Sequence, residues 1–351
     1  MKPTRVGIIG CGVIATSGHA PAYQTAAKKD LCEIVGVCDP ILSKAKNLGS
    51  IVNAPHFQSP EALFEAVGPE AVSIATLPNE HKRLSLLAFD AGAHVLCEKP
   101  IAMNFGEAAD IVDAAKDAKR KFSICFQYRT WQESQHIKTL IDNGTLGHVH
   151  SIRTWGGETY GFKAVPARYN WQTASGGVIA HWTIHNIDLA LWLLGFPTAV
   201  SVNSFHHQRI KKNPDALGGN ANLIDVTNVE DRIEDYAASM IRLENDAVLT
   251  VESNRLQPPY DRPEGWEILG SKGSASISPI KVWLDEQGQW KDATPSNLDS
   301  CNYDMSLLIH EFLMCVRSNT SPSVKPNQIL QLQRIVDALY TSGHTGKEVV
   351  I

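Results

Sequence analysis

The first part of the chain alternates short apolar runs with longer stretches of helical periodicity. The apolar runs occupy residues 5–10, 33–38, 71–76, 94–98 and 122–127. Helical stretches run from about 80 to 91 and from about 106 to 118. A third begins at Ser59 and Pro60, a cap residue followed by proline. Strands that alternate with helices predict βαβ units, and therefore an α/β fold with a doubly wound parallel sheet.

The pattern changes after residue 127. A helix is expected near 132–143 and a strand near 148–155. A strongly apolar helix from about 177 to 194 ends at Gly195-Phe196-Pro197. Pairs of strand-like runs follow, joined by turns near 244–246, 271–273 and 287–288. This part predicts an α+β domain with a large, mostly antiparallel open sheet.

The length of 351 residues favours two domains. We expect the doubly wound domain over 1–126 and the α+β domain over 127–351. The two closing helices, near 303–317 and 326–341, are expected to pack back onto the first domain. The polar segment 208–225 is predicted to be a long loop.

Composition and charge exclude several classes of protein. The formal net charge is −5 and no apolar run approaches 18 residues, so neither nucleic acid nor a membrane is an expected partner. The seven cysteines form no CxxC pair and no close cluster, which favours reduced thiols. The apolar stretch that begins at Val6 is too short for a signal peptide, so the expected location is the cytoplasm.

A glycine-rich segment follows the first apolar run. Residues 10–15 read GCGVIA and match G-x-G-x-x-A between a strand and a helix. The glycines let the backbone turn tightly and approach a pyrophosphate, which the helix N-terminus stabilises. The contacts expected here are Gly10, Gly12, Val13 and Ile14. The alternative is a tight turn that binds nothing.

An acidic residue at the end of the second strand distinguishes the two dinucleotides. Asp39 lies 27 residues after Gly12 and is placed to bind the adenosine ribose hydroxyls. Its charge would repel a 2′-phosphate, so NAD is favoured over NADP. Lys44 and Lys46 keep NADP as the alternative.

Residues 176–188 read GGVIAHWTIHNID and combine an apolar helix with a polar stripe. At about 100° per residue, the stripe consists of His181, His185, Asp188 and Trp192. Buried polar groups need partners. The stripe is therefore either structural or part of a site.

Several longer motifs run through the whole chain. They are GCGVIA, VCDP, SIATLPNEHK, HVLCEKPIAMN, LIDNGTLGHV, SGGVIAHWTIHNIDLALWLLG and PSVKPNQILQLQRIVDALY. In these motifs the chain resembles the Gfo/Idh/MocA family of glucose–fructose oxidoreductase and inositol dehydrogenase. The resemblance implies a Rossmann domain that holds NAD(P) at the ends of its parallel strands, with substrate between that edge and the face of the second sheet. It also implies sugars, sugar derivatives or cyclitols as substrates.

The resemblance also implies roles for individual residues. Lys99 matches the family's catalytic lysine beside the nicotinamide, where an ammonium stabilises negative charge on the reacting oxygen. His185 matches the histidine that accepts the hydroxyl proton. The further cofactor contacts implied are Thr76, Leu77, Pro78, Asn79, His81, Glu98 and Gln127.

His181 departs from the family pattern, which usually has an aspartate at this position. An imidazole brings no fixed negative charge, so a different substrate or a different division of labour is expected. We predict that His181 contacts substrate or shares proton transfer, with no metal. A structural role and a divalent ion held by His181 and His185 stay open as alternatives. A third ligand for such an ion could come from Glu158, His150, His206 or His207.

A polar and aromatic stretch just before the helix has the composition of a carbohydrate site. The substrate contacts predicted are Tyr128, Arg129, Glu158, Tyr160, Lys163, Arg168 and Trp171, together with His181 and His185. Arg129 could equally be a salt-bridged interdomain arginine. Asp188 is expected to support the site or to accept an interdomain hydrogen bond.

Three functions are compatible with these residues. The leading hypothesis is an NAD-dependent dehydrogenase that oxidises a secondary alcohol of a carbohydrate or cyclitol. The second is a glycoside-cleaving enzyme that uses transient oxidation, elimination and re-reduction, so that NAD is recycled. The third is a non-catalytic NAD-sensing regulator, against which Lys99 and His185 argue. An open sheet with one uncovered face also favours a homodimer or homotetramer.

Overall fold

The computed structural model describes residues 2–159, 170–208, 233–257, 264–298 and 304–351. The chain forms two compact units. The first comprises Met1–Gln127 and Tyr303–Leu330, and the second comprises Tyr128–Asn302 and Gln331–Ile351. The loop predicted over 208–225 lies, from residue 209 on, outside the described residues.

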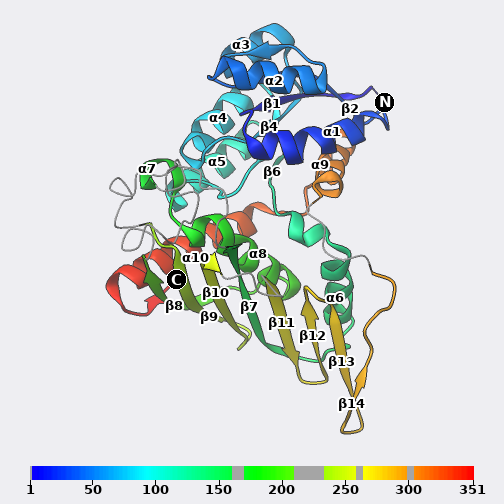
Figure 1. Cartoon of the computed structure of the whole chain (residues 1–351), viewed down its shortest axis with the longest axis vertical. Coiled ribbons are helices and arrows are strands. Elements are labelled where there is room, and N and C mark those ends of the chain that lie inside the picture. Colours follow the sequence, from blue (N-terminus) through cyan, green and yellow to red (C-terminus); the bar gives the residue numbers. More distant parts are fainter. Residues whose placement is uncertain (1, 160–169, 209–232, 258–263, 299–303) are drawn as a thin grey trace. The chain divides into compact units, whose positions relative to one another are not determined.

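The first unit is built on a six-stranded parallel sheet (Figure 1). Its strands are β1 (Thr4–Ile9), β2 (Cys32–Cys38), β3 (His56–Phe57), β4 (Ala71–Ile74), β5 (His94–Cys97) and β6 (Phe122–Ile124). They lie in the order β3-β2-β1-β4-β5-β6. The sequence order reverses between β1 and β4, which defines a doubly wound sheet with its ligand edge at the carboxyl ends. The fold class predicted for this part of the chain is confirmed.

Helices connect these strands and begin where the sequence provides caps. They are η1 (Ala15–His19), α1 (Ala20–Ala27), α2 (Leu42–Val52), α3 (Pro60–Val67), α4 (Pro78–Asp90) and α5 (Phe105–Asp117). The hydroxyl of Ser59 accepts the N–H of Ala62 at the start of α3, as the Ser-Pro signal predicted. The helix ends at Gly68, whose φ of +49° favours glycine.

A helix from far along the chain completes the core of the first unit. Helix α9 (Ser306–Ser318) contacts α1, and its buried face includes Phe312 and Ile309. These side chains belong to the same apolar cluster as Tyr23. Arg317, near the end of α9, donates to the backbone carbonyls of Lys2 and Leu31.

The second unit is built on a nine-stranded mixed sheet. Its strands are β7 (Val149–Thr159), β8 (Ala199–His207), β9 (Tyr236–Leu243), β10 (Val248–Gln257), β11 (Gly265–Gly270), β12 (Gly273–Ile277), β13 (Lys281–Glu286), β14 (Gln289–Asp292) and β15 (Val349–Val350). They lie in the order β14-β13-β12-β11-β7-β10-β9-β8-β15, and only β7 and β10 pair in parallel (Figure 1). The three predicted hairpins, β9–β10, β11–β12 and β13–β14, are all present. The mostly antiparallel sheet is therefore confirmed.

Helical segments accompany this sheet, and some of them pack on one face of it. They are η2 (Gln127–Thr130), α6 (Gln132–Asp142), α7 (Trp171–Ala174), η4 (Ile179–Thr183), α8 (Ile184–Leu193) and α10 (Pro326–Thr345), of which η2 and α10 begin in the first unit. Helix α8 contacts β7 and β10, and α6 contacts α8 and β12. Neither α10, the longest described helix, nor any other described helix is both long and apolar enough to cross a membrane.

The opposite face of the sheet is exposed. Along β9 buried residues such as Ile241 alternate with exposed ones such as Met240, which is 44% exposed. Exposed apolar side chains also occur on other strands, at Leu269 on β11 and Trp283 on β13. The strict alternation is the pattern expected of a sheet that is packed on one side only.

The cysteines of the described part of the chain are all free. Six of the seven are described, and each of the six is buried. In β2 and β5 they occupy positions in the apolar interior of the parallel sheet. They pack as small hydrophobic side chains, which agrees with the prediction of reduced thiols.

The contribution of α9 to the first unit is testable. We expect Phe312→Ala to lower the free energy of unfolding by about 3–5 kcal/mol, because a buried aromatic side chain would leave a cavity. Leu307→Ala, on the exposed face of the same helix, should change it by less than about 0.5 kcal/mol. Urea unfolding measures both variants. Equal losses would mean that α9 does not pack as described.

Candidate active site

The glycine loop leaves β1 and turns sharply into the first helix. Gly10 has a φ of +91°, and a Cβ at this position would lie 2.6 Å from the carbonyl oxygen of Ala75. Only glycine fits both this conformation and this close approach. A Cβ at Gly12 would meet nothing within 4 Å, and the side chain of Val13 is 80% exposed. One side of the loop is therefore packed against the end of β4, while the other side is open.

Asp39, directly after β2, holds the loop in this shape. Its Oδ2 accepts a hydrogen bond from the N–H of Cys11 at 2.9 Å, and its Oδ1 accepts one from the N–H of Ile41 at 2.8 Å. A carboxylate has about four lone-pair positions, so each oxygen keeps one for a further donor. Burial, followed by the charge of Asp39, raises the pKa of the Cys11 thiol to about 12, and the thiol stays neutral.

These residues fit an NAD molecule. The open side of Gly12 leaves room for a pyrophosphate, and Asp39 carries the acceptors that ribose hydroxyls require. At the start of α4, the buried Oδ1 of Asn79 has no hydrogen-bond partner among the described residues. A buried oxygen without a donor is costly, and a bound ligand would supply one.

His81 joins two loops at this edge of the sheet. Its Nδ1 lies 2.8 Å from the carbonyl oxygen of Pro100, and its Nε2 lies 3.4 Å from that of Thr76. Burial lowers the pKa of His81, so the ring is neutral and its one N–H donates to Pro100 at the shorter distance. Of the other predicted contacts in this loop, Leu77 is exposed and Pro78 is buried at the start of α4.

Lys99 follows β5 at the same edge. It is half-buried, and its backbone N–H donates to Oε2 of Glu98 at 3.1 Å. Glu98 is 5% exposed, and Gln127, at the start of η2, is 1% exposed. Strands β2, β1, β4 and β5 are neighbours in the sheet, so their carboxyl ends bring together Gly10, Asp39, Thr76 and Lys99.

In the second unit His181 and His185 are both buried, at 7% and 4% exposure. The prediction of a single regular helix over 177–194 is wrong in one respect. A π-turn spans Ile179–Thr183, closed by a hydrogen bond from the N–H of Ile184 to the carbonyl of Ile179. The additional residue in this turn changes the angle between His181 and the residues that follow. The polar stripe is therefore not one straight line along an α-helix.

His185 lies in a stack of aromatic rings. The ring of Tyr128 is 4.7 Å from that of His185, at an angle of 24°, and 4.0 Å from that of Trp131. The hydroxyl of Tyr128 donates to Oε2 of Glu264 at 3.2 Å. Burial raises the pKa of Glu264 to about 7. Tyr128, which is 3% exposed, thus fixes the plane of the histidine ring.

Arg129 and Asp188 form a buried ion pair. Nε of Arg129 donates to Oδ2 at 2.9 Å and Nη2 donates to Oδ1 at 2.5 Å. The guanidinium also lies over the ring of Phe196, 5.1 Å from its centroid. Of the two alternatives for Arg129, the structure shows the salt bridge, but both partners belong to the second unit and the pair is not interdomain.

Glu234 and Tyr340, which sequence reasoning missed, hold the start of the histidine helix. The Glu234 carboxylate accepts the N–H groups of Gly177 at 3.0 Å and Ile179 at 2.8 Å, and the Tyr340 hydroxyl at 2.9 Å. A Cβ at Gly177 would lie 1.8 Å from the carbonyl oxygen of Glu234, so only glycine fits. Burial raises the pKa of Glu234 to about 7 despite these donors. No local signal could reveal this contact, because Tyr340 lies 163 residues from Gly177.

Asn186 is a second residue without a predicted role. Its side chain donates to the hydroxyl of Thr154 on β7 at 2.7 Å, and its carbonyl accepts the indole N–H of Trp266 at 3.4 Å. These contacts attach α8 to the sheet. The sequence signal that could have identified Asn186 is its place between His185 and Asp188 in the same motif.

Among the described residues, no third ligand lies close enough to His181 and His185 to complete the metal site considered as an alternative. The one close group of three potential ligands there is His19, Glu98 and Cys125, and it includes neither His181 nor His185. The side chain of Glu158, one of the suggested third ligands, lies outside the described residues.

Three other predicted substrate contacts cannot be placed. Tyr160, Lys163 and Arg168 lie outside the described residues. Trp171 is described and begins α7, with its ring edge-on to Tyr340 at 4.9 Å.

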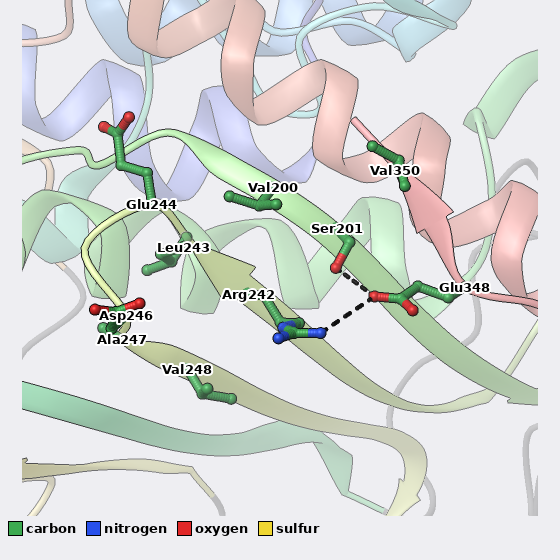
Figure 2. A pocket seen from close by; sticks show the side chains of 10 residues that line it. All are labelled: Val200, Ser201, Arg242, Leu243, Glu244, Asp246, Ala247, Val248, Glu348 and Val350. Carbon is green, nitrogen blue, oxygen red and sulfur yellow. Dashed lines mark hydrogen bonds and ion pairs between the residues drawn. The ribbon is translucent and has the colours of Figure 1, made fainter.

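A pocket of the second unit lies at a different place from the predicted site residues (Figure 2). It is lined by Val200, Ser201, Arg242, Leu243, Glu244, Asp246, Ala247, Val248, Glu348 and Val350. Figure 2 shows Ser201 and Arg242 both directed at the carboxylate of Glu348. These polar groups satisfy one another at the edge formed by β8 and β15, so the pocket does not define the candidate site.

The cap at Glu234 generates a pH prediction. The pKa of about 7 lies above the usual 4.5, so the stability that this carboxyl contributes is present below about pH 4.5 and is lost as the pH rises towards 7. Glu264, whose pKa is also raised to about 7, adds a loss over this window that the native protein and the variant share. We therefore expect Glu234→Gln to lose up to about 3 kcal/mol less unfolding free energy than the native protein over this window. Urea unfolding at about pH 5 and about pH 8 measures it. Glu286→Gln, at an exposed position of β13, is the control and should follow the native protein.

Comparison with known proteins agrees with this fold. Residues 4–126 match the model of an oxidoreductase family with an NAD-binding Rossmann fold, and residues 134–276 match the GFO/IDH/MocA C-terminal domain. The chain is 29% identical over 350 residues to D-glucoside 3-dehydrogenase of Escherichia coli, covering 99% of this chain and 97% of that protein. It is 24% identical to myo-inositol 2-dehydrogenase of Thermotoga maritima, covering 81% and 79%.

A solved structure has the same fold over the whole length. The structure of a levoglucosan dehydrogenase in complex with NADH superimposes with a TM-score of 0.86 at 21% identity, covering 100% of this chain and 99% of that one. The two family models together span most of the chain, and their boundary lies near residue 127, where the first unit passes into the second. The chain therefore belongs to the Gfo/Idh/MocA family of oxidoreductases, and its first unit is an NAD-binding Rossmann domain.

Proposed function

We propose that this protein is an NAD-dependent dehydrogenase that oxidises a secondary alcohol of a sugar, sugar derivative or cyclitol. One observation carries the proposal: half-buried Lys99 lies at the same sheet edge as the glycine loop and Asp39. Parallel sheets of this kind bind their ligands at that edge. The names of the relatives, a D-glucoside 3-dehydrogenase and a myo-inositol 2-dehydrogenase, support the substrate class.

The first unit would hold the cofactor and polarise the alcohol. The residues proposed to hold NAD are Gly10, Gly12, Val13, Ile14, Asp39, Thr76, Leu77, Pro78, Asn79, His81, Glu98, Lys99 and Gln127. When bound, NAD supplies the acceptor for the hydride that leaves the alcohol carbon. The ammonium of Lys99 donates a hydrogen bond to the reacting oxygen and stabilises the charge that develops on it.

The second unit would supply the base. His185 accepts the hydroxyl proton, since an imidazole titrates near working pH. Its stack with Tyr128 orients the ring, and its burial excludes water that would compete for the proton. His181 would contact substrate where the family usually has an aspartate. The remaining predicted substrate contacts are Tyr128, Arg129, Glu158, Tyr160, Lys163, Arg168 and Trp171.

No specific observation favours the glycoside-cleaving alternative. The relatives named here are dehydrogenases. We also place the protein in the cytoplasm, a proposal supported by six buried thiols that form no disulfide among the described residues.

The substrate class is tested by following NADH absorbance. Purified protein is mixed with excess NAD and a panel of cyclitols, free sugars, acidic sugars and aryl glycosides, and the products are identified. We expect NADH to accumulate steadily with at least one member of the panel. Cleavage of a glycoside while NADH stays flat or rises only transiently would contradict the dehydrogenase.

The same assay tests the residues. We expect Lys99→Ala and His185→Asn each to lower kcat by roughly 10²–10⁴-fold. Binding of NADH, measured by fluorescence, should change only by a few-fold in His185→Asn. Lys116→Ala, on the exposed face of α5, is the lysine control and should be unaffected. Full activity of both variants would refute the assignment.

We further propose that the exposed face of the second sheet joins copies of the chain into a homodimer or homotetramer. Met240 on β9, Leu269 on β11 and Trp283 on β13 are exposed apolar side chains of that face. Exposed apolar side chains of this kind occur at interfaces. We expect light scattering to give a multiple of the 38.4 kDa chain mass, and Met240→Glu to reduce it. Leu307→Glu, exposed on α9, is the control; a monomeric native protein would exclude the proposal.

A further inference from the structure

A chain of buried hydrogen bonds lies behind Lys99. The Tyr23 hydroxyl, on α1, lies 2.8 Å from the hydroxyl of Ser73 on β4. Ser73 lies 3.0 Å from Nδ1 of His19, the last residue of η1. Nε2 of His19 lies 3.0 Å from Oε1 of Glu98, whose other oxygen accepts the N–H of Lys99. Tyr23, Ser73 and His19 are each 0% exposed, so no water competes with these contacts.

The direction of these hydrogen bonds follows from the last acceptor. An ionised carboxylate only accepts, so Nε2 of His19 carries the proton that points at Glu98. In a neutral ring Nδ1 then accepts, and the donor available to it is the Ser73 hydroxyl. Ser73 in turn accepts from Tyr23. Every donor in the chain is therefore directed towards Glu98.

We propose that Tyr23, Ser73 and His19 act as positioning residues that fix the Glu98 carboxylate, and that Glu98 in turn holds Lys99 in place and in its ammonium form. The proposal rests on the role of Lys99 in the proposed function. It extends the site to three fully buried residues of the first unit.

His19 and Lys99 are the two basic groups that act on Glu98. Burial alone would raise the pKa of Glu98, but the hydrogen bond and charge of His19, followed by the charge and N–H of Lys99, outweigh it, and the pKa lies below its usual value. Burial raises the pKa of the neighbouring thiols Cys97 and Cys125 far above their usual range. Burial lowers the pKa of His81, the remaining neighbour. By reciprocity, the carboxylate that Lys99 stabilises also stabilises the ammonium of Lys99.

The same atoms include a possible cation site. One ligand atom each from His19, Glu98 and Cys125 lie within 4.8 Å of one another. Both nitrogens of His19 already face protein groups at hydrogen-bond distance, however, and the Cys125 thiol hydrogen-bonds to Glu98. The contacts therefore favour a hydrogen-bonded chain of protein groups over a metal.

Two serine variants on the same sheet test the proposal. Ser73→Ala removes the donor to Nδ1 of His19, so the ring loses one of the two contacts that hold it against Glu98. Ser123→Ala, on β6, makes the same change at a buried hydroxyl that has no hydrogen-bond partner among the described residues. The readout is the pH profile of kcat/KM with the substrate found in the NADH assay.

We expect the alkaline limb of the Ser73→Ala profile to move. A less stabilised Lys99 ammonium moves that limb down by about one pH unit, while the acid limb, which the proposed base His185 sets, stays in place. Ser123→Ala should keep both limbs of the native profile. Native limbs in Ser73→Ala, or equal shifts in the two variants, would overturn the proposal.

A second test needs no turnover and is made on the native protein. ¹⁵N NMR of the imidazole rings of the native protein, with His19 assigned from His19→Gln, reports which nitrogen carries the proton. We expect the proton on Nε2 alone at about pH 8. A proton on Nδ1, alone or together with Nε2, would overturn the direction proposed for these hydrogen bonds. Stoichiometric Zn²⁺ in the purified protein would overturn the proposal as well.

Failure of this inference is distinguishable from failure of the proposed function. If Lys99→Ala keeps native kcat/KM, the role of Lys99 itself is wrong. If Lys99→Ala is inactive but Ser73→Ala keeps the native limbs, only the hydrogen-bond chain is wrong.

Discussion

Within each unit, buried carboxylates that accept several donors hold the residues of the candidate site in place. Asp39 fixes the glycine loop, Glu98 lies behind Lys99, Asp188 binds Arg129, and Glu234 caps the histidine helix. Removing a carboxylate from water is costly, and each of these four offsets the cost with at least two hydrogen bonds. Such groups cannot shift without leaving buried donors unpaired. The side chains proposed to carry the chemistry are therefore supported by groups that have little freedom to move.

The parts of this structure that could be predicted from the sequence depend on local periodicity and turns. The five apolar runs and the three hairpins each satisfy a rule that involves neighbouring residues only. The glycine loop was equally accessible, because a positive φ at Gly10 and an acid after β2 leave a signature in a short segment. Lys99 also lies in a short motif, but its role is implied by the family resemblance and stays a prediction.

The contacts that position the site could not be predicted, since they join residues far apart in the chain. Gly177 meets Glu234 and Tyr340, and Tyr23 meets Ser73, only once the sheets have formed. The π-turn before α8 has the same origin. Within it, the hydroxyl of Thr183 bonds to the carbonyl of Val178 and to Ser253 on β10. Helical periodicity contains no record of such tertiary contacts, so it predicted a regular helix.

The glycine pair at 176 and 177 limits how this site can be redesigned. A Cβ at Gly176 would lie 1.8 Å from the Tyr340 hydroxyl, and one at Gly177 equally close to the backbone of Glu234. A library of variants aimed at new substrates therefore has to leave both glycines unchanged, even where it varies the proposed substrate contact His181, about one turn further along. The two glycines set the limit on how close to the start of this helix such changes can come.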